Sequence, residues 1–285
     1  MEDDAKLQTL SSQSVCKHII VVACIGACVP GCGKAFTTDK DSDASIIANT
    51  SGGTSSEAGV ASAISKDGLL LWLRSDQGAT DANGFVSQWL DQSGHHFDAI
   101  QNEAASRPTL LVAGIGGHPT LRFDGVDDSF QLPSGMADFA LGLTMFVVVN
   151  ERQSDLYASL LEFSNGSEVD DIAFGQYQNE LAYEVADQSM QGDPIQYNVP
   201  QIYTAVHNTD GNLTLRRNGS VAGTYTLSLP VAVTREQNFV GQSLYAGSGT
   251  YFGLLGEVLV YGRALSDADL VNTESDLKRR WSCCN

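Results

Sequence analysis

The feature of this sequence that most limits its fold is a series of short apolar runs, separated by turn residues about every 8–12 positions from residue 66 onward. Segments 68–73, 143–149 and 254–261 are apolar almost throughout, which predicts strands buried on both faces. With 28 glycines and only 18% charged residues, the chain is richer in turn formers and poorer in Lys and Glu than helical bundles are. The sequence therefore predicts an all-β fold.

The stretch 202–226 shows the strand pattern most clearly. Leu213 and Leu215 alternate with polar residues, and Asn218-Gly219 separates them from a second alternating run. Asn-Gly in this setting predicts a hairpin, because both central positions of a type I′ turn need a positive φ. We expect an antiparallel meander in which the two leucines face the core and Arg216 faces water.

The end of the chain has a helical pattern instead. Ser266 can cap a helix that begins at the next residue, with Asp269 at its third position. Leu270, Leu277 and Trp281 are spaced seven and four residues apart, which places them on one face of such a helix. We expect one amphipathic helix that closes the domain.

Four segments, in this order, resemble the bacterial LamG-like, concanavalin A-like jelly-roll domains of secreted and cell-surface proteins. They are GLLLWL at 68–73 with QWLDQSG at 88–94, HPTLRFDGVDD at 118–128, LTL at 213–215 with the Asn-Gly turn, and GEVLVYGRALS at 256–266 before the helix. Each motif is weak alone, and their order and spacing make the combination specific for the fold. The likeness covers residues 66–281.

The resemblance implies a two-sheet antiparallel jelly-roll sandwich whose first and last strands are neighbours. Relatives of this kind include lectins, adhesion modules, calcium-binding proteins and glucanases, so the fold alone leaves the role open. We expect a single domain at 66–285 that acts as a non-catalytic binding module for a glycan or a protein partner. A degenerate glycoside hydrolase and a purely structural envelope or matrix protein are the alternatives.

The segment before this domain has a different composition. Residues 19–31 form an uncharged run that is shorter than the about 20 apolar residues of a membrane span and suits an export signal. The small residues before Cys32 resemble a bacterial lipobox, with Cys28 as the alternative acylated residue. We expect a lipoprotein-type signal at 1–32, a flexible Gly/Ser/Ala/Thr-rich tether at 33–65, and a lipid anchor at the bacterial cell envelope, in the outer membrane or at the cell surface.

Net charge narrows the class of partner. Asp and Glu number 34 against 16 Lys and Arg, which gives a formal charge of −18. A field of this sign repels phosphate backbones and anionic lipid headgroups, because binding to either relies on Lys and Arg that displace counterions. We therefore expect no nucleic-acid partner, and membrane association only through the lipid anchor.

Asp124, Asp127 and Asp128 crowd one short segment around Gly125. Carboxylates are the hard oxygen ligands that Ca²⁺ takes, together with backbone carbonyls. The same residues also fit an Asx turn flanked by surface charges. Both interpretations stay open, with Ca²⁺ as the candidate cofactor and no other cofactor expected.

Sugar-binding surfaces use exposed aromatic rings, because the C–H faces of a sugar stack on them while its hydroxyls reach amides and carboxylates. Five tyrosines stand beside polar residues and are the candidate ligand-binding residues: Tyr177, Tyr183, Tyr197, Tyr245 and Tyr251. Each of them also fits an ordinary half-buried strand position. Trp72 and Trp281 are expected in the core.

One segment bears on catalysis. Glucanases of this fold carry carboxylates that alternate along one strand as Glu-x-Asp-x-(x)-Glu, because alternate side chains share a face. Glu168 and Asp170 begin this pattern, but Ile172 and Ala173 stand where the second glutamate belongs. We expect no catalytic residues.

The cysteines offer no internal disulfide framework. Four of the six precede residue 33, and the other two, Cys283 and Cys284, are adjacent. Adjacent cysteines bond to one another only with strain. We expect two exposed thiols, or pairing between molecules.

Overall fold

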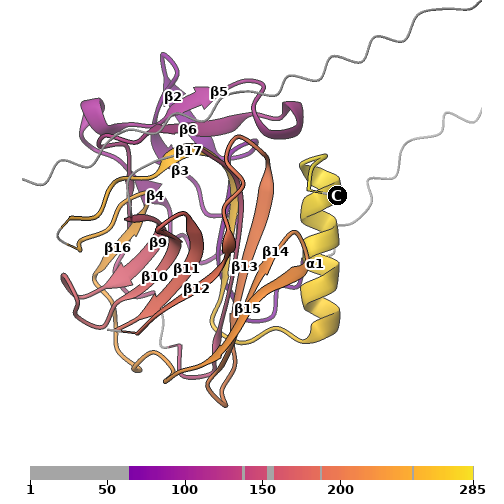
Figure 1. Ribbon diagram of the computed structural model, residues 1–285. Coiled ribbons are helices and arrows are strands. Elements are labelled where there is room, and N and C mark those ends of the chain that lie inside the picture. Colours follow the sequence, from indigo (N-terminus) through magenta and orange to yellow (C-terminus); the bar gives the residue numbers. More distant parts are fainter. Residues whose placement is uncertain (1–63, 137–138, 153–156, 187, 246, 285) are drawn as a thin grey trace, which may run out of the picture. The chain divides into compact units, whose positions relative to one another are not determined.

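The structure, a computed structural model, describes residues 64–284 apart from 137–138, 153–156, 187 and 246 (Figure 1). The predicted signal at 1–32, which includes Cys32 and Cys28, and the predicted tether up to residue 63 lie outside the described residues. The strands are β1 Leu69–Arg74, β2 Ala79–Ala82, β3 Phe85–Trp89, β4 Ala99–Ile100, β5 Thr109–Leu111, β6 Thr120–Asp124, β7 Phe130–Leu132, β8 Leu143–Glu151, β9 Tyr157–Ser164, β10 Ile172–Tyr177, β11 Glu180–Val185, β12 Gln188–Pro194, β13 Gln201–His207, β14 Asn212–Arg217, β15 Ser220–Thr226, β16 Gln237–Val240 and β17 Phe252–Tyr261. Two 3₁₀ turns, η1 Ala104–Ser106 and η2 Ile115–Gly117, and the helix α1 Asp267–Arg280 complete the described elements.

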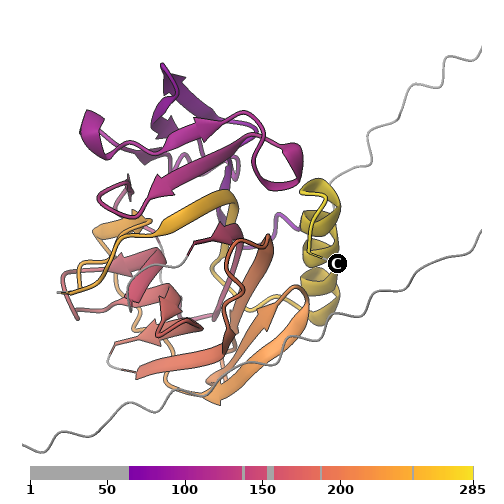
Figure 2. The same cartoon turned by 45° about the horizontal axis from the view of Figure 1, so that its top comes forward.

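The strands form two antiparallel sheets. In the first sheet the order is β17, β8, β13, β14 and β15, and both β1 and β6 pair with the other edge of β17. In the second sheet the order is β7, β16, β9, β10, β11 and β12. Strands β3, β4 and β5 connect the two sheets at one side, between β6 and β7 (Figure 2). The predicted all-β sandwich with one C-terminal helix is confirmed.

The first and last strands are neighbours, as the resemblance implied. Trp72 on β1 lies opposite Leu259 on β17. The predicted meander is also present as β13, β14 and β15. Its hairpin turn has Asn218 and Gly219 at φ values of 52° and 82°, so the Asn-Gly signal identified the turn correctly.

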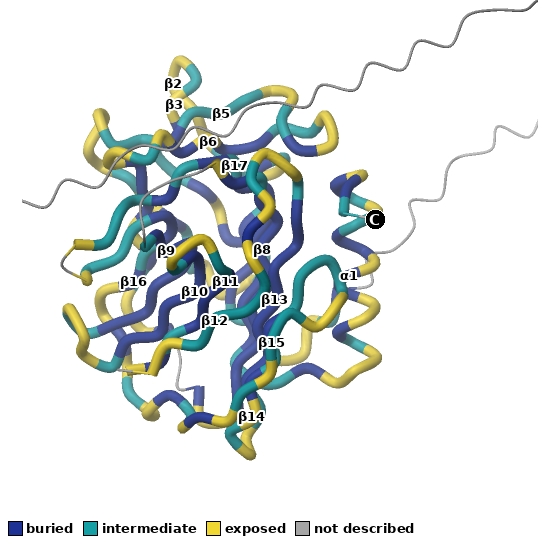
Figure 3. The backbone as a smooth tube through the Cα atoms, viewed as in Figure 1, coloured by how far each residue is buried: buried dark blue, intermediate teal, exposed yellow. Residues whose placement is uncertain are grey.

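Apolar side chains form two cores, one on each face of the first sheet. Successive side chains of a strand point to opposite faces. In β8, Met145 and Val147 accordingly lie in the first core, between the sheets, while Phe146 and Val148 lie in the second core, beneath α1. Figure 3 shows β8 and β13 as buried along most of their length. This double burial explains why the sequence of β8 is apolar almost throughout.

Helix α1 covers the outer face of the first sheet. The Ser266 side chain accepts a hydrogen bond from the Asp269 backbone N–H, and Leu270, Leu277 and Trp281 are buried in the second core, as predicted. The prediction that Arg216 faces water was wrong. That face of β14 lies under the helix, where the Arg216 guanidinium pairs with Glu274 at 2.7 Å.

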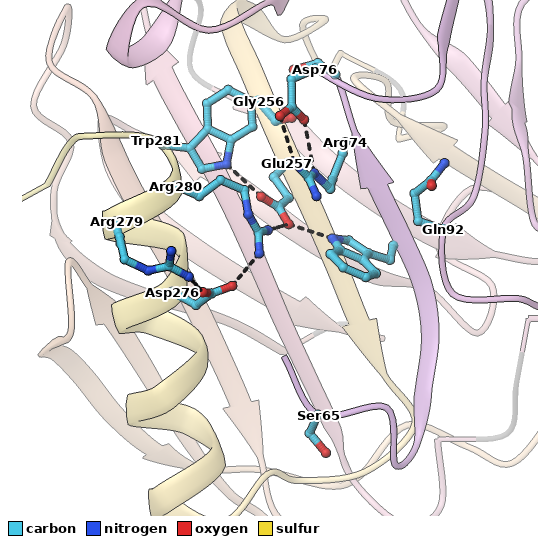
Figure 4. A network of polar contacts seen from close by, with 12 residues as sticks. Ser65, Arg74, Asp76, Gln92, Gly256, Glu257, Asp276, Arg279, Arg280 and Trp281 are labelled. Atoms are coloured by element: carbon cyan, nitrogen blue, oxygen red, sulfur yellow. Dashed lines mark hydrogen bonds and ion pairs between the residues drawn. The ribbon is translucent and has the colours of Figure 1, made fainter. Parts of the chain in front are cut away.

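A buried carboxylate joins α1 to the sheet (Figure 4). Glu257 on β17 accepts hydrogen bonds from the indole N–H groups of Trp72, at 2.6 Å, and Trp281, at 2.7 Å. Arg280 pairs with the same carboxylate and also with Asp276 one turn earlier in the helix. Each oxygen of this fully buried carboxylate therefore has a donor, which a charge in the interior requires.

Both ends of the described chain differ from expectation. Ile64 is buried in the second core, and the backbone carbonyl of Ser65 accepts a hydrogen bond from the Tyr261 hydroxyl at 3.1 Å, so the folded part includes residues before 66. Cys283 and Cys284 are bonded to each other, so the expectation of free or intermolecular thiols was wrong. Within the described residues, no helix has the length and apolarity to cross a membrane.

Candidate functional site

A pocket opens on the outer face of the second sheet, over β9, β10 and β11. Tyr157 on β9 lies opposite Tyr177 on β10, and their ring centroids are 5.7 Å apart with the planes at 68°. Tyr245, from the loop between β16 and β17, brings a third ring whose centroid is 5.9 Å from that of Tyr157. These rings, together with Glu168 and Glu184, line a cavity of about 620 Å³.

Residues with small side chains occupy the centre of this face of the sheet. Ser159, Gly175 and Ala182 are cross-strand neighbours on β9, β10 and β11. A β carbon at Gly175 would lie 2.3 Å from the backbone carbonyl oxygen of Ala158, so this position accommodates only glycine. These small residues therefore lie beneath the pocket, and the longer tyrosine and glutamate side chains form its walls.

Carboxyl groups give the pocket its electrostatic character. Burial raises the pKa of Glu184, and the nearby Asp171 and Glu162 raise it further, whereas a 2.9 Å hydrogen bond from the Tyr157 hydroxyl opposes the rise. Burial also raises the pKa of Glu162 and of Asp171. Among the described residues that line the pocket there is no Lys or Arg. The site therefore gathers desolvated carboxyl groups, and no described residue of its lining offers a basic side chain to pair with them.

Two residues of the pocket have a left-handed backbone conformation. Glu168 has a φ of 59° and Ala186 a φ of 53°, and both line the cavity. Such a conformation costs a non-glycine residue about 1–2 kcal/mol. Strained residues of this kind gather at binding sites, where the surrounding structure holds them in place.

Two of the five predicted tyrosines are in this pocket. Tyr177 and Tyr245 line it, and Tyr245 is 45% exposed. Tyr197 is half-buried outside the pocket, and its hydroxyl donates to the Asn179 side chain at 2.7 Å. The structure thus brings together Tyr177 and Tyr245 but not Tyr197.

The prediction was wrong for the other two tyrosines. Tyr183 is 0% exposed and Tyr251 is 2% exposed, so neither presents a ring to a ligand. Both lie in the first core: Tyr183 takes an inward position on β11, and Tyr251 packs inward just before β17. Sequence reasoning missed Tyr157, which begins β9. Its alternation with Ser159 was the available signal, but only the pairing with β10 places it beside Tyr177.

The three predicted calcium ligands converge. Asp124, Asp127 and Asp128 each offer one oxygen, and these oxygens lie within 4.8 Å of one another. The Asp124 side chain also accepts a hydrogen bond from the Val126 backbone N–H at 2.8 Å, and Asp128 accepts one from the Asp124 N–H at 2.9 Å. Burial and the neighbouring Asp124 raise the pKa of Asp128 to about 6. The segment is therefore an Asx turn whose remaining oxygens fit a hard cation that also takes carbonyl or water ligands.

The glucanase-like segment has a different arrangement from the one sought in the sequence. Ile172 points into the first core, and Ala173 lies on the outer face between Glu162 on β9 and Glu184 on β11. Carboxylates do meet on this face, but they come from two strands, β9 and β11, and from the loop before β10. A search along a single strand could not find them.

Comparison with known proteins shows the fold. No family model matches the sequence, and no curated protein matches it. Domain 4 of AbnA, a GH43 extracellular arabinanase from Geobacillus stearothermophilus, solved in complex with arabinotriose, matches with a TM-score of 0.53 and 14% identity over 72% of this chain and 98% of that chain.

Two further structures extend the comparison. The binding domain of Paraclostridial Mosquitocidal Protein 1 matches with a TM-score of 0.55 and 12% identity over 74% of this chain and 52% of that one. Trypanosoma rangeli sialidase in complex with sialic acid matches with a TM-score of 0.51 and 14% identity over 76% of this chain and 34% of that one. The chain thus spans about half of the toxin binding domain and a third of the sialidase. At these identities, what is shared is the β-sandwich fold.

Proposed function

We propose that this protein is a non-catalytic glycan-binding module, held at the bacterial cell surface by a lipid anchor, and that the pocket over β9, β10 and β11 is its binding site. The observation that carries the proposal is the meeting of Tyr157, Tyr177 and Tyr245 with Glu168 and Glu184 around one cavity of about 620 Å³. Ligand sites commonly have volumes of about 300–1,000 Å³, with aromatic walls and a few polar groups.

The chemistry of the pocket suits a sugar. Rings that meet at an angle offer stacking surfaces to the C–H faces of a pyranose or furanose, while carboxylates accept hydrogen bonds from its hydroxyl groups. Domain 4 of the arabinanase, which shares the fold, was solved with arabinotriose, and this supports a carbohydrate as the class of ligand. A protein partner would be expected to need a larger apolar contact than this pocket offers.

Binding of an array of neutral, acidic and amino-sugar oligosaccharides, followed by titration calorimetry of the best ligand, tests the proposal. Tyr245→Ala should weaken binding about tenfold, because one stacking ring is lost. Tyr197→Ala is the matched control, since this tyrosine lies outside the pocket, and it should leave the affinity unchanged. Equal losses in the two variants, or no glycan bound at all, would contradict the assignment.

Glycoside hydrolysis is the second candidate, because Glu168 and Glu184 both line the pocket and burial raises the pKa of Glu184. A general acid needs a raised pKa of this kind, together with a second carboxylate across the scissile bond. Reducing-sugar release from the bound glycan measures this activity. Turnover that Glu184→Gln abolishes while binding persists would replace the non-catalytic assignment.

Calcium and the lipid anchor are separate parts of the proposal. Calorimetric titration of Ca²⁺ should give binding that Asp128→Asn abolishes, and glycan affinity measured with and without chelator shows whether the ion assists. Metabolic labelling with a fatty-acid analogue should mark the wild-type chain and Cys28→Ser but not Cys32→Ser. If Cys32→Ser were labelled and Cys28→Ser were not, Cys28 would be the acylated residue. If no chain were labelled, the proposal of a lipid anchor would be wrong.

A further inference from the structure

We infer that the glycan recognised by the pocket over β9, β10 and β11 carries a free ammonium group, as a hexosamine does once its N-acetyl group has been removed. The inference rests on the proposed function and names the chemical class of the ligand. It is carried by two independent properties of the pocket, the arrangement of its rings and the balance of its charges.

The three tyrosine rings lie next to one another with their planes at different angles. Tyr157 meets Tyr177 at 68°, and Tyr245 stands on the other side of Tyr157 with its plane tilted by 38°. Faces of tyrosine rings attract cations, because the π system carries a negative face, and sites for organic ammonium groups are built from several such rings around one point.

The charged residues around the pocket also favour a ligand with an ammonium group. Glu168 and Glu184 line the pocket, and the charges of Asp171, which lines a neighbouring cavity, and of Glu162 raise the pKa of Glu184. The Oδ1 atom of Asp171 is buried and has no hydrogen-bond partner among the described residues, although the carboxyl groups of Asp171 and Glu184 interact with each other. An incoming cation would offset this accumulation of buried negative charge, whereas an anionic sugar would add to it.

Arg235 influences Asp171 but does not line the tyrosine pocket. Arg235 lowers the pKa of Asp171 through its charge, but its guanidinium donates to the backbone carbonyls of Asp170, at 2.6 Å, and Val231, at 3.2 Å. Arg235 and Asp171 both line a neighbouring cavity of about 240 Å³ rather than the tyrosine pocket. The described lining of the tyrosine pocket itself consists of tyrosines, glutamates, Ala186 and Ser189.

The chain shows the same chemistry elsewhere with a cation of its own. The Lys66 ammonium lies 4.0 Å from the centroid of the Trp72 ring, and the guanidinium of Arg280 lies 5.6 Å from it. On that side of the molecule, basic side chains of the protein occupy the space above an aromatic ring and beside a carboxylate. In the tyrosine pocket the ligand has to supply the cation.

The test compares three oligosaccharides of equal length by calorimetry with the full mature chain: a glucosamine oligomer, its fully N-acetylated form, and its N-trimethylated form, which stays charged at every pH. The glucosamine oligomer, with its amines protonated, should bind about tenfold more tightly than the N-acetylated one. Raising the ionic strength should reduce the difference in affinity between these two oligomers. Binding of the N-trimethylated form should strengthen as the pH rises through the raised pKa of Glu184, because the carboxylate forms there.

Two variants make the test specific to the pocket. Glu184→Gln should reduce the preference for the charged oligomers at least about fivefold while leaving the N-acetylated oligomer unaffected. Glu103→Gln removes the same charge from an exposed residue outside the pocket and should change neither affinity. A loss of preference in both variants would assign the effect to net charge and would overturn the inference.

The outcomes separate this inference from the proposed function. Equal affinity for charged and neutral oligomers, or tighter binding of the neutral one, would overturn the ammonium assignment and leave a glycan-binding module. Binding of choline at the tyrosines without binding of any oligosaccharide would overturn the glycan, in this inference and in the proposed function alike. Binding of none of these probes would overturn the ammonium assignment, and the array of neutral, acidic and amino-sugar oligosaccharides would then decide the proposed function.

Discussion

The outer faces of the two sheets satisfy their polar groups in opposite ways. On the first sheet, α1 covers the face, and Glu257 has the indoles of Trp72 and Trp281 and the guanidinium of Arg280 as partners. On the second sheet, no described helix covers β9, β10 and β11, and Glu184 has the Tyr157 hydroxyl but no basic side chain among the described pocket residues. Aromatic rings and carboxylates occur on both faces, but among the described residues basic side chains pair with carboxylates on the covered face and none lines the tyrosine pocket.

The difference teaches how to separate a structural cluster from a binding site when the residue types are the same. A buried carboxylate that is fully paired holds elements together, and breaking its pairing costs stability. A carboxylate that is desolvated without a counter-charge is a cost to the fold, which natural proteins retain at functional sites. The comparison therefore makes opposite predictions for substitutions on the two faces.

The largest effect is expected on the covered face. Glu257→Gln leaves an amide N–H group facing an indole N–H and removes a charge partner of Arg280, so the free energy of unfolding should fall by about 3–5 kcal/mol. Urea unfolding followed by tryptophan fluorescence measures it. Asp193→Asn, which loses an exposed ion pair with Arg217, is the control and should cost less than about 1 kcal/mol. Similar losses in the two variants would show that Glu257 does not fasten α1.

A carboxylate between these extremes sharpens the comparison. Glu151 is 1% exposed, faces the first core, and accepts a 3.0 Å hydrogen bond from Tyr203. Burial raises its pKa from 4.5 to about 8, and the Tyr203 hydrogen bond only partly opposes the rise. Because the folded chain keeps this proton longer than the unfolded chain, stability should fall by about 1.4 kcal/mol per pH unit between the two values.

Unfolding free energies of the wild type and Glu151→Gln, measured from pH 5 to 8, check this expectation. The difference between the two curves isolates Glu151 from the other titrating groups. The variant should lose the part of the pH dependence that Glu151 contributes. Parallel curves would mean that the carboxyl titrates alike in the folded and unfolded chains.

The smallest effect, with the opposite sign, is expected on the open face. Glu184→Gln removes one of several repelling carboxyls, so the free energy of unfolding at neutral pH should rise, by less than about 1 kcal/mol because the site is partly exposed. The pKa of Glu184 is higher in the folded chain, so the gain should appear as the pH rises through that pKa and vanish in acid. Chemical denaturation at two pH values measures it. A destabilised variant would place Glu184 with Glu257 among the structural carboxylates.

Local pattern predicted much of the fold. The Asn218-Gly219 turn, the Ser266 cap and the apolar face of Leu270, Leu277 and Trp281 were all confirmed, because each depends on residues close together in the chain. The calcium candidates also converge, since three aspartates within five positions cannot lie far apart. Binding of Ca²⁺, binding of a glycan and attachment of a lipid remain predictions.

The site needed long-range information. Tyr177 and Tyr245 were among the candidates, but Tyr183 and Tyr251 looked the same in the sequence and are buried. Which face a strand residue takes depends on register, and a shift of one residue moves every side chain to the other face. Tyr157 was missed for the same reason.

The sequence by itself determined the antiparallel strands, their tight turns and the closing helix, because spacing and turn chemistry act over a few residues. The tertiary structure decided which of two similar faces α1 would cover, and so which carboxylates would be paired. Glu257 is hydrogen-bonded to Trp72, 185 residues away in the chain, whereas the described partners of Glu184 are a tyrosine and other carboxyl groups. That difference depends on contacts between strands distant in the chain, which no local pattern encodes.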